Sequence, residues 1–170
     1  MSNTKAITDF SSAMAGLENL AEAKVGLARS MAVAGGKVIR DEAKLRAPVG
    51  NVDGSHNVPG ALRAAIYLAH RDGQSGESRQ VYQVSWNAKR APHGHLVEFG
   101  HWQTHAAYLD AAGEWRRGAP LPVPKWVAAK PFLRPAYDAA MPRAREAMLA
   151  RGSERLAEIL ASQPEKPDEL

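Results

Sequence analysis

A long helix is the feature of this sequence that most restricts its fold. Across residues 8–46, apolar side chains recur every seven residues in two series offset by three, which is the spacing of one stripe along a helix. The members are Leu17, Met31, Val38 and Leu45 in the first series and Leu20, Leu27 and Ala34 in the second. Pro48 should end the helix, because proline disfavours helical backbone at the preceding residue. The fold must therefore accommodate one helix far longer than the usual three turns.

Polar and glycine residues modify this helix. Lys24 and Asp41 each occupy one position of the apolar stripe, so we do not expect a regular coiled coil. Gly35 and Gly36 lie inside the helix, where each glycine costs about 1 kcal/mol relative to alanine. We expect this pair either to kink the helix or to let another backbone approach closely.

Two segments after Pro48 alternate between apolar and other side chains. The alternating positions are Leu62, Ala64, Ile66 and Leu68 in the first segment and Tyr82, Val84 and Trp86 in the second. A period of two predicts strands with one face against a core, and we expect a sheet over about residues 61–88. The polar hairpin loop between them, His70–Arg79, is longer than usual. We expect it to project, either into solvent or toward a neighbouring molecule.

Residues 100–130 form the least regular stretch, which we expect to be a long loop. Alternating prolines in Ala119–Pro124 favour an extended, polyproline-type rod. Aromatic side chains on a stiff loop suit a subunit interface, because they bury large areas at low entropic cost. The alternative is that they fold back over the protein's own core. The interface candidates are Trp102, Tyr108, Trp115 and Trp126.

The C-terminal part is expected to be helical over residues 131–161 and to end in an acidic tail over residues 162–170. Pro142 should kink the helix, and Gly152-Ser153 resembles a break followed by a new helix start. The tail is polar, acidic and contains prolines, so its composition predicts disorder unless another subunit holds it. We therefore expect a single domain over residues 1–161, followed by this tail.

Composition limits the classes of function. The chain has 170 residues, 45% of them hydrophobic, and no cysteine, which excludes disulfides and thiolate chemistry. No apolar run reaches the roughly 18–20 residues of a membrane span, and Met1–Phe10 lacks a signal-peptide pattern, so we expect no membrane partner. The net charge of +4 leaves two interpretations of the basic clusters: solvated helix faces or contacts with nucleic acid. These clusters are Lys37-Arg40-Lys44-Arg46, Arg116-Arg117 and Arg143-Arg145-Arg151.

Catalytic and metal-binding patterns are weak. His101 and His105 have the i, i+4 spacing of a helical zinc pair, but no glutamate lies between them to act as a base. His93 and His95 form a second pair that more often belongs to a polar surface. The sequence has no phosphate-binding glycine loop and no G-x-S-x-G elbow. We expect no enzyme activity, catalytic residue, cofactor or metal.

Several short motifs in order resemble the HK97-type phage minor tail component family, whose members are also called tail-completion, neck or head–tail connector proteins. Ala47-Pro48 ends the long helix, and Gly60–Ile66 resembles the family's entry into its first strand. Val97-Glu98-Phe99-Gly100 resembles a short helical element of the family, and Pro131–Ala136 resembles the start of its C-terminal helix. We predict that the last two motifs pack together as a structural hub, with Phe99 and Phe132 buried. The hub residues are Val97, Glu98, Phe99, Gly100, Pro131, Phe132, Leu133 and Pro135.

The resemblance implies an α+β fold, with a small, mostly antiparallel sheet packed by the long N-terminal helix and the C-terminal helix. It also implies a structural protein at the head–tail junction of a tailed phage or prophage, made in the bacterial host cytoplasm. It implies a ring or collar of identical copies, most simply sixfold like a tail or else twelvefold like a portal. The implied partners are a portal or head-closure adaptor, a tail terminator or tail-tube protein, and DNA passing non-specifically through the lumen. The alternative is a small basic DNA-binding module.

Overall fold

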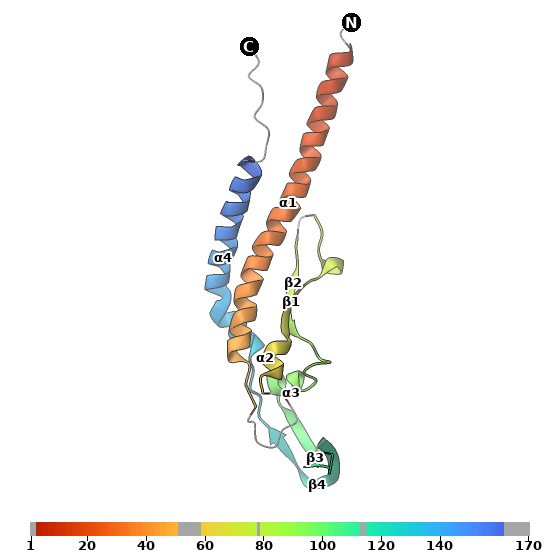
Figure 1. Ribbon diagram of the computed structural model, residues 1–170, viewed down its shortest axis with the longest axis vertical. Helices are drawn as coiled ribbons and strands as arrows, with labels where there is room; N and C mark the ends of the chain where they lie inside the picture. Colours follow the sequence, from red (N-terminus) through yellow and green to blue (C-terminus); the bar gives the residue numbers. More distant parts are fainter. Residues whose placement is uncertain (1–2, 51–58, 78, 113–114, 162–170) are drawn as a thin grey trace. The chain divides into compact units, whose positions relative to one another are not determined.

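The computed structural model describes residues 3–50, 59–77, 79–112 and 115–161 (Figure 1). The side chains of residues 3–22, Leu109 and Trp115 are outside this description, and so is the acidic tail predicted over residues 162–170. The chain divides into two compact units. Unit 1 comprises Met1–Lys37, Ala69–Gln83 and Pro142–Leu170, and unit 2 comprises Val38–Leu68 and Val84–Met141. The single domain expected over residues 1–161 stays a prediction.

The fold class is α+β, as predicted. A long N-terminal helix, two small antiparallel sheets and a C-terminal helix make up the described part of the chain (Figure 1). None of its helices has both the length and the apolar character needed to cross a membrane.

Helix α1 runs without interruption over Asn3–Arg46, so the glycine pair does not break it. The other expectation for Gly35-Gly36, that another backbone approaches closely, is confirmed within unit 1. A Cβ on Gly35 would lie 2.6 Å from Met148 Cγ and 3.2 Å from Ala144 O. The predicted apolar stripe is wrong at its C-terminal end, where Leu45 is 74% exposed. Ala43 and Ala47 are buried in its place, because their small side chains let other segments of unit 2 pack closely around them.

Two glycines of α1 give a matched pair for testing this close approach. Gly26→Ala is expected to raise the free energy of unfolding by about 0.5–1 kcal/mol, because alanine is the better helix former and nothing lies within 4 Å of the added Cβ. Gly35→Ala is expected to lose that gain and to destabilise the protein, because the added methyl meets Met148 and the Ala144 carbonyl. Urea unfolding of both variants measures the difference, and equal stabilisation by the two would contradict the packing.

Helix α4 is also continuous, over Leu133–Ala161. The predicted break at Gly152-Ser153 is wrong, because the Ser153 hydroxyl donates to the Leu149 carbonyl (3.1 Å) inside the helix instead of capping a new one. Gly152 allows close packing in unit 1, since a Cβ there would lie 3.0 Å from Met31 Sδ. Pro142 lies within the helix and does not end it, and the kink expected there stays a prediction.

Exposed ion pairs lie along the last turns of α4. Arg151 contacts Glu154 (3.1 Å) and Glu158 (3.0 Å), and Arg155 contacts Glu158 (2.7 Å). Hydrogen bonds donated by Arg155 and then Arg151 lower the pKa of Glu158, and donating to Glu158 and then Glu154 raises the pKa of Arg151. Arg151 is the one member of the predicted cluster in these pairs, and its contacts along its own helix fit the solvated-face interpretation for this residue.

The first predicted strand begins later than expected. Ala61–Ala65 forms the short helix α2, and only Ile66–His70 forms strand β1. Leu62, Ala65 and Ile66 are buried, and their i, i+3, i+4 spacing is that of a helical face rather than of an alternating strand. The second predicted strand is confirmed: Tyr82–Trp86 forms strand β2, which pairs with β1. A short 3-10 helix, η1 (Asp72–Gln74), lies in the connecting loop.

The prediction of an irregular loop over residues 100–130 is wrong for most of this range. Strands β3 (His101–Leu109) and β4 (Trp115–Val127) form an antiparallel hairpin within unit 2 (Figure 1). The register jumps between Gln103↔Lys125 and His105↔Pro120, so residues 121–124 of β4 lie opposite Thr104 alone. Pro122 and Pro124 fall in this bulge, where a missing N–H removes no ladder hydrogen bond. The extended proline segment is thus part of a strand.

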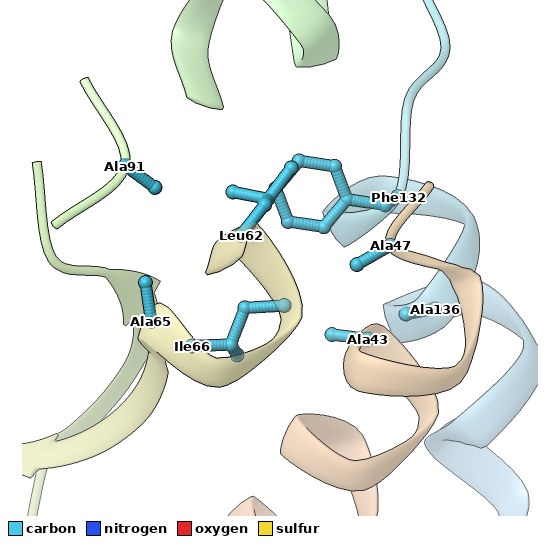
Figure 2. Close-up of a cluster of buried hydrophobic side chains, with 8 residues drawn as sticks. All are labelled: Ala43, Ala47, Leu62, Ala65, Ile66, Ala91, Phe132 and Ala136. Atoms are coloured by element: carbon cyan, nitrogen blue, oxygen red, sulfur yellow. The ribbon is translucent and has the colours of Figure 1, made fainter. Parts of the chain in front are cut away.

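The core of unit 2 consists mainly of small side chains around one aromatic ring. Phe132 is the largest fully buried side chain in the described part of the chain, and its ring points toward Leu62 with Ala47 beside it (Figure 2). The ring of Trp86 packs edge-on against it, with centroids 6.0 Å apart. The cluster comprises Ala43, Ala47, Leu62, Ala65, Ile66, Ala91, Phe132 and Ala136.

Candidate functional site

A buried glutamate joins the two motifs at which the hub was predicted. The Glu98 carboxylate lies at the end of helix α3 (Gly94–Phe99) and accepts hydrogen bonds from three backbone N–H groups at the start of α4. The distances are 2.7 Å from Phe132, 3.1 Å from Leu133 and 3.3 Å from Arg134. Glu98 is only 7% exposed, so these bonds replace water. A negative charge at a helix N-terminus also interacts favourably with the helix dipole.

The sequence at the start of α4 complements this cap. A helix leaves its first N–H groups without partners, and a Ser, Thr, Asp or Asn normally satisfies them from the preceding position. Here the preceding residues are Ala129-Lys130-Pro131-Phe132, which offer no such side chain. Pro135 has no N–H to satisfy, so the donors of this turn are those that Glu98 binds. The missing local cap was the signal that a distant side chain had to supply one.

Gly100 lets the chain turn directly after Glu98. Its φ of 73° lies in the left-handed region that favours glycine, and its N–H donates to the Leu96 carbonyl (2.9 Å). A Cβ at Gly100 would lie 2.8 Å from Val127 O and 2.9 Å from Ala129 N. The Lys130 N–H donates to the Val97 carbonyl (2.8 Å) nearby. The end of α3 and the segment after β4 are therefore held together by backbone contacts as well as by Glu98.

The two phenylalanines of the predicted hub have different environments. Phe132 is fully buried in the core of unit 2. The expected burial of Phe99 is wrong, because its side chain is 71% exposed. Glu98 points inward to cap α4, and the neighbouring residue on a short helix then faces away from the same core. Whether the hub is decisive for stability stays a prediction.

A pocket of about 350 Å³ lies beside the cap within unit 2. Its walls are mostly apolar, and Lys130 is the only Lys, Arg, Asp or Glu among the described residues that line it. His93 and His101 also line it, and the Nδ1 atom of His101 is buried without a hydrogen-bond partner among the described residues. The lining residues are Pro48, Val49, Gly50, Gly60, Ala61, Leu62, His93, Leu96, Val97, His101, Val127, Ala128 and Lys130.

The β3–β4 hairpin carries exposed aromatic side chains. Trp102 and Trp126 are partners in the register, and their rings meet edge-on with centroids 5.3 Å apart. Trp102 is 61% exposed, Trp126 49% and Tyr108 52%, so these interface candidates do not fold back over a core. Trp115 begins β4, but its side chain lies outside the described residues. Val123, in the bulge of β4, is 76% exposed. The hairpin therefore presents two exposed tryptophan rings in contact with each other, not single scattered apolar residues alone.

Basic side chains on the hairpin differ in their partners. Arg116 pairs with Asp110 at 2.8 Å. Arg117 contacts the His105 ring, with 2.7 Å between its guanidinium nitrogen and Nε2. Lys125 has no ion-pair partner in the part of the chain that the structure describes. The hairpin therefore combines exposed tryptophans with two cations, Arg117 and Lys125, that no described carboxylate neutralises.

The histidine pairs do not form a metal cluster in the described residues. His101 and His105 lie in strand β3, not on a helix, so their i, i+4 spacing does not bring the rings together as in a helical zinc pair. His93 and His95 flank the first residue of α3. The described residues contain no group of three or more His, Cys, Asp or Glu side chains that could hold a metal ion. The expected absence of a metal stays a prediction.

The family model described as "HK97-gp10_like: Bacteriophage HK97-gp10, putative tail-component" matches residues 12–100 of the chain. This range covers much of α1, both strands of the first sheet, and α3 with Glu98 and Gly100. No curated protein and no solved structure matches the chain at a significant level.

Proposed function

Because the chain belongs to the HK97-gp10-like family of bacteriophage tail components, we propose that it joins the head of a tailed phage to its tail as a ring or collar of identical copies. A structural tail component acts by binding other virion proteins, and it needs no catalytic centre. The observation that best supports the proposal is the exposed tryptophan pair on the β3–β4 hairpin, Trp102 and Trp126. Such a pair is costly to leave in water and is typical of the centre of a protein interface.

Ring closure gives this surface a partner. In a cyclic ring each copy uses two different patches, one that docks and one that receives, and the rotation between copies must close. The hairpin is the docking patch, because a two-stranded ribbon with a stiff, proline-containing strand loses little entropy on binding. Sixfold symmetry would match a tail, and twelvefold symmetry would match a portal. The faces of the ring would contact a portal or head-closure adaptor on one side and a tail terminator or tail-tube protein on the other.

Replacing both hairpin tryptophans tests this proposal in the particle. Trp102→Ala with Trp126→Ala is expected to leave filled heads and separate tails that fail to join, because the interface loses its largest apolar contacts. Electron microscopy of lysates and infectious yield measure the result. Tyr137→Ala is the matched control, since this aromatic residue is 50% exposed on α4 and lies off the hairpin. Normal yield from the double variant would contradict the interface, though not the family.

A second candidate function rests on the two hairpin cations, Arg117 and Lys125, beside the tryptophans. Cations next to exposed aromatic rings also suit binding to nucleic acid, through phosphate contacts and base stacking. A DNA-binding module would show an affinity that falls steeply with salt and that Arg117→Ala and Lys125→Ala weaken. If the protein had no measurable affinity for DNA near physiological salt, the DNA-binding function would be contradicted. Only passive contact with DNA passing through the lumen of a ring would then remain.

A further inference from the structure

We propose that the pocket beside the Glu98 cap receives the acidic segment of residues 162–170 from a neighbouring copy. This inference rests on the proposed ring and names its receiving patch. The pocket is lined in part by Leu62, Leu96 and Lys130, and this mixture of apolar groups and a positive charge complements the prolines and carboxylates of the segment.

The volume and walls of the pocket suit a short apolar group. About 350 Å³ is at the lower end of the range for small-ligand sites and accommodates a few side chains of a peptide, not a folded element. Leu62, Leu96, Val97 and Val127 contribute apolar surface, so an occupant gains by burying carbon atoms there.

The polar groups of the pocket favour a negatively charged occupant. Among the described residues, Lys130 has no ion-pair partner, and none of those that line the pocket carries a carboxylate. The hydrogen bond from the Lys130 N–H to the Val97 carbonyl fixes the backbone from which this lysine extends. His101 Nδ1 is buried and unpartnered in the described structure, so an occupant with a hydrogen-bonding group would satisfy it. A peptide that presents an apolar side chain next to a carboxylate fits these groups.

The segment of residues 162–170, Ser-Gln-Pro-Glu-Lys-Pro-Asp-Glu-Leu, has this pattern twice. Pro164 is followed by Glu165, and Pro167 is followed by Asp168 and Glu169. Three carboxylates and one lysine give the segment a net charge of −2. Residues three apart share a face of a polyproline helix, and Pro164 and Pro167 have this spacing in the sequence. Proline also restricts the free chain, which reduces the entropy lost on binding.

A labelled peptide of residues 162–170 tests the pocket on the full chain. Fluorescence anisotropy at low salt is expected to show saturable binding, because electrostatic attraction is then screened least. The same peptide with Glu165→Gln, Asp168→Asn and Glu169→Gln is expected to bind about tenfold more weakly. Equal binding of the charged and neutral peptides, or no saturable binding of either, would overturn the proposal.

Two pairs of protein variants locate the binding site. Lys130→Glu, which reverses the pocket charge, and Ala128→Trp, which adds bulk at its wall, are both expected to weaken peptide binding about tenfold or more. The controls are Lys125→Glu, a second exposed lysine, and Ala129→Trp, an exposed neighbour of Ala128, because neither residue lines the pocket. Binding lost in the controls but kept in the pocket variants would place the peptide outside the pocket and overturn the assignment.

Phage assembly separates this inference from the proposed function. Lys130→Glu is expected to reduce head–tail joining. Adding Glu165→Lys and Asp168→Lys to this variant is expected to restore part of the joining, because the charges of the pocket and of the segment are then both reversed and attract again. Rings that form normally in Lys130→Glu would overturn the pocket assignment and leave the ring standing. Peptide binding at the pocket without any ring in the particle would contradict the proposed function and leave the pocket as a peptide site.

Discussion

Replacing Phe132 with alanine is expected to lower the free energy of unfolding by about 3–5 kcal/mol. The side chain is 0% exposed and lies at the centre of a cluster otherwise made largely of alanines, which cannot move to fill the cavity. The loss also removes the edge-on contact with Trp86. For a protein of this size, each kcal/mol lowers the melting temperature by about 2–4 °C. Thermal melts followed by circular dichroism should therefore show a fall of at least several degrees.

Phe99 provides the matched control. Phe99→Ala removes the same side chain from a site that is 71% exposed, so it is expected to change stability by no more than about 0.5 kcal/mol. If Phe132→Ala melted like the natural protein, the packing of unit 2 described above would be wrong. A large loss in Phe99→Ala would instead show that Phe99 is buried in solution, for example between copies of the chain.

Replacing Glu98 with alanine is expected to cost about 2–4 kcal/mol, more than an ordinary helix cap. A surface cap contributes about 0.5–2 kcal/mol, whereas each buried donor left without a partner costs about 1–3 kcal/mol. Three N–H groups, those of Phe132, Leu133 and Arg134, lose their acceptor at once, and part of this cost is recovered where water reaches them. Urea unfolding measures the change.

Two further variants separate the parts of this cost. Glu98→Gln keeps one acceptor oxygen but loses the negative charge at the N-terminus of α4, so we expect an intermediate loss. Glu146→Ala removes an exposed glutamate of α4 and should be nearly neutral. If Glu98→Ala were as mild as Glu146→Ala, the carboxylate would not hold the two motifs together, and the contact between them would rest on Gly100 and Lys130 alone.

The sequence by itself determined the elements whose signals are local. The seven-residue stripe predicted α1, and the alternation around Val84 predicted β2. The ordered motifs also predicted the family, because they depend on residue identity along the chain. Each of these signals lies within one element or its ends.

Only the tertiary structure decided the features that depend on residues far apart in the chain. The cap on α4 comes from Glu98, 34 residues before Phe132, and no local pattern can show which distant carboxylate fills a missing cap. The pairing of β3 with β4 was hidden by prolines that normally interrupt strands and that here lie in a bulge. Ala43 and Ala47 replaced Leu45 in the core because helix packing selects the side chain that fits, not the most hydrophobic one. Phe99 is exposed for the same reason, since the inward position on α3 belongs to the charged residue that α4 requires.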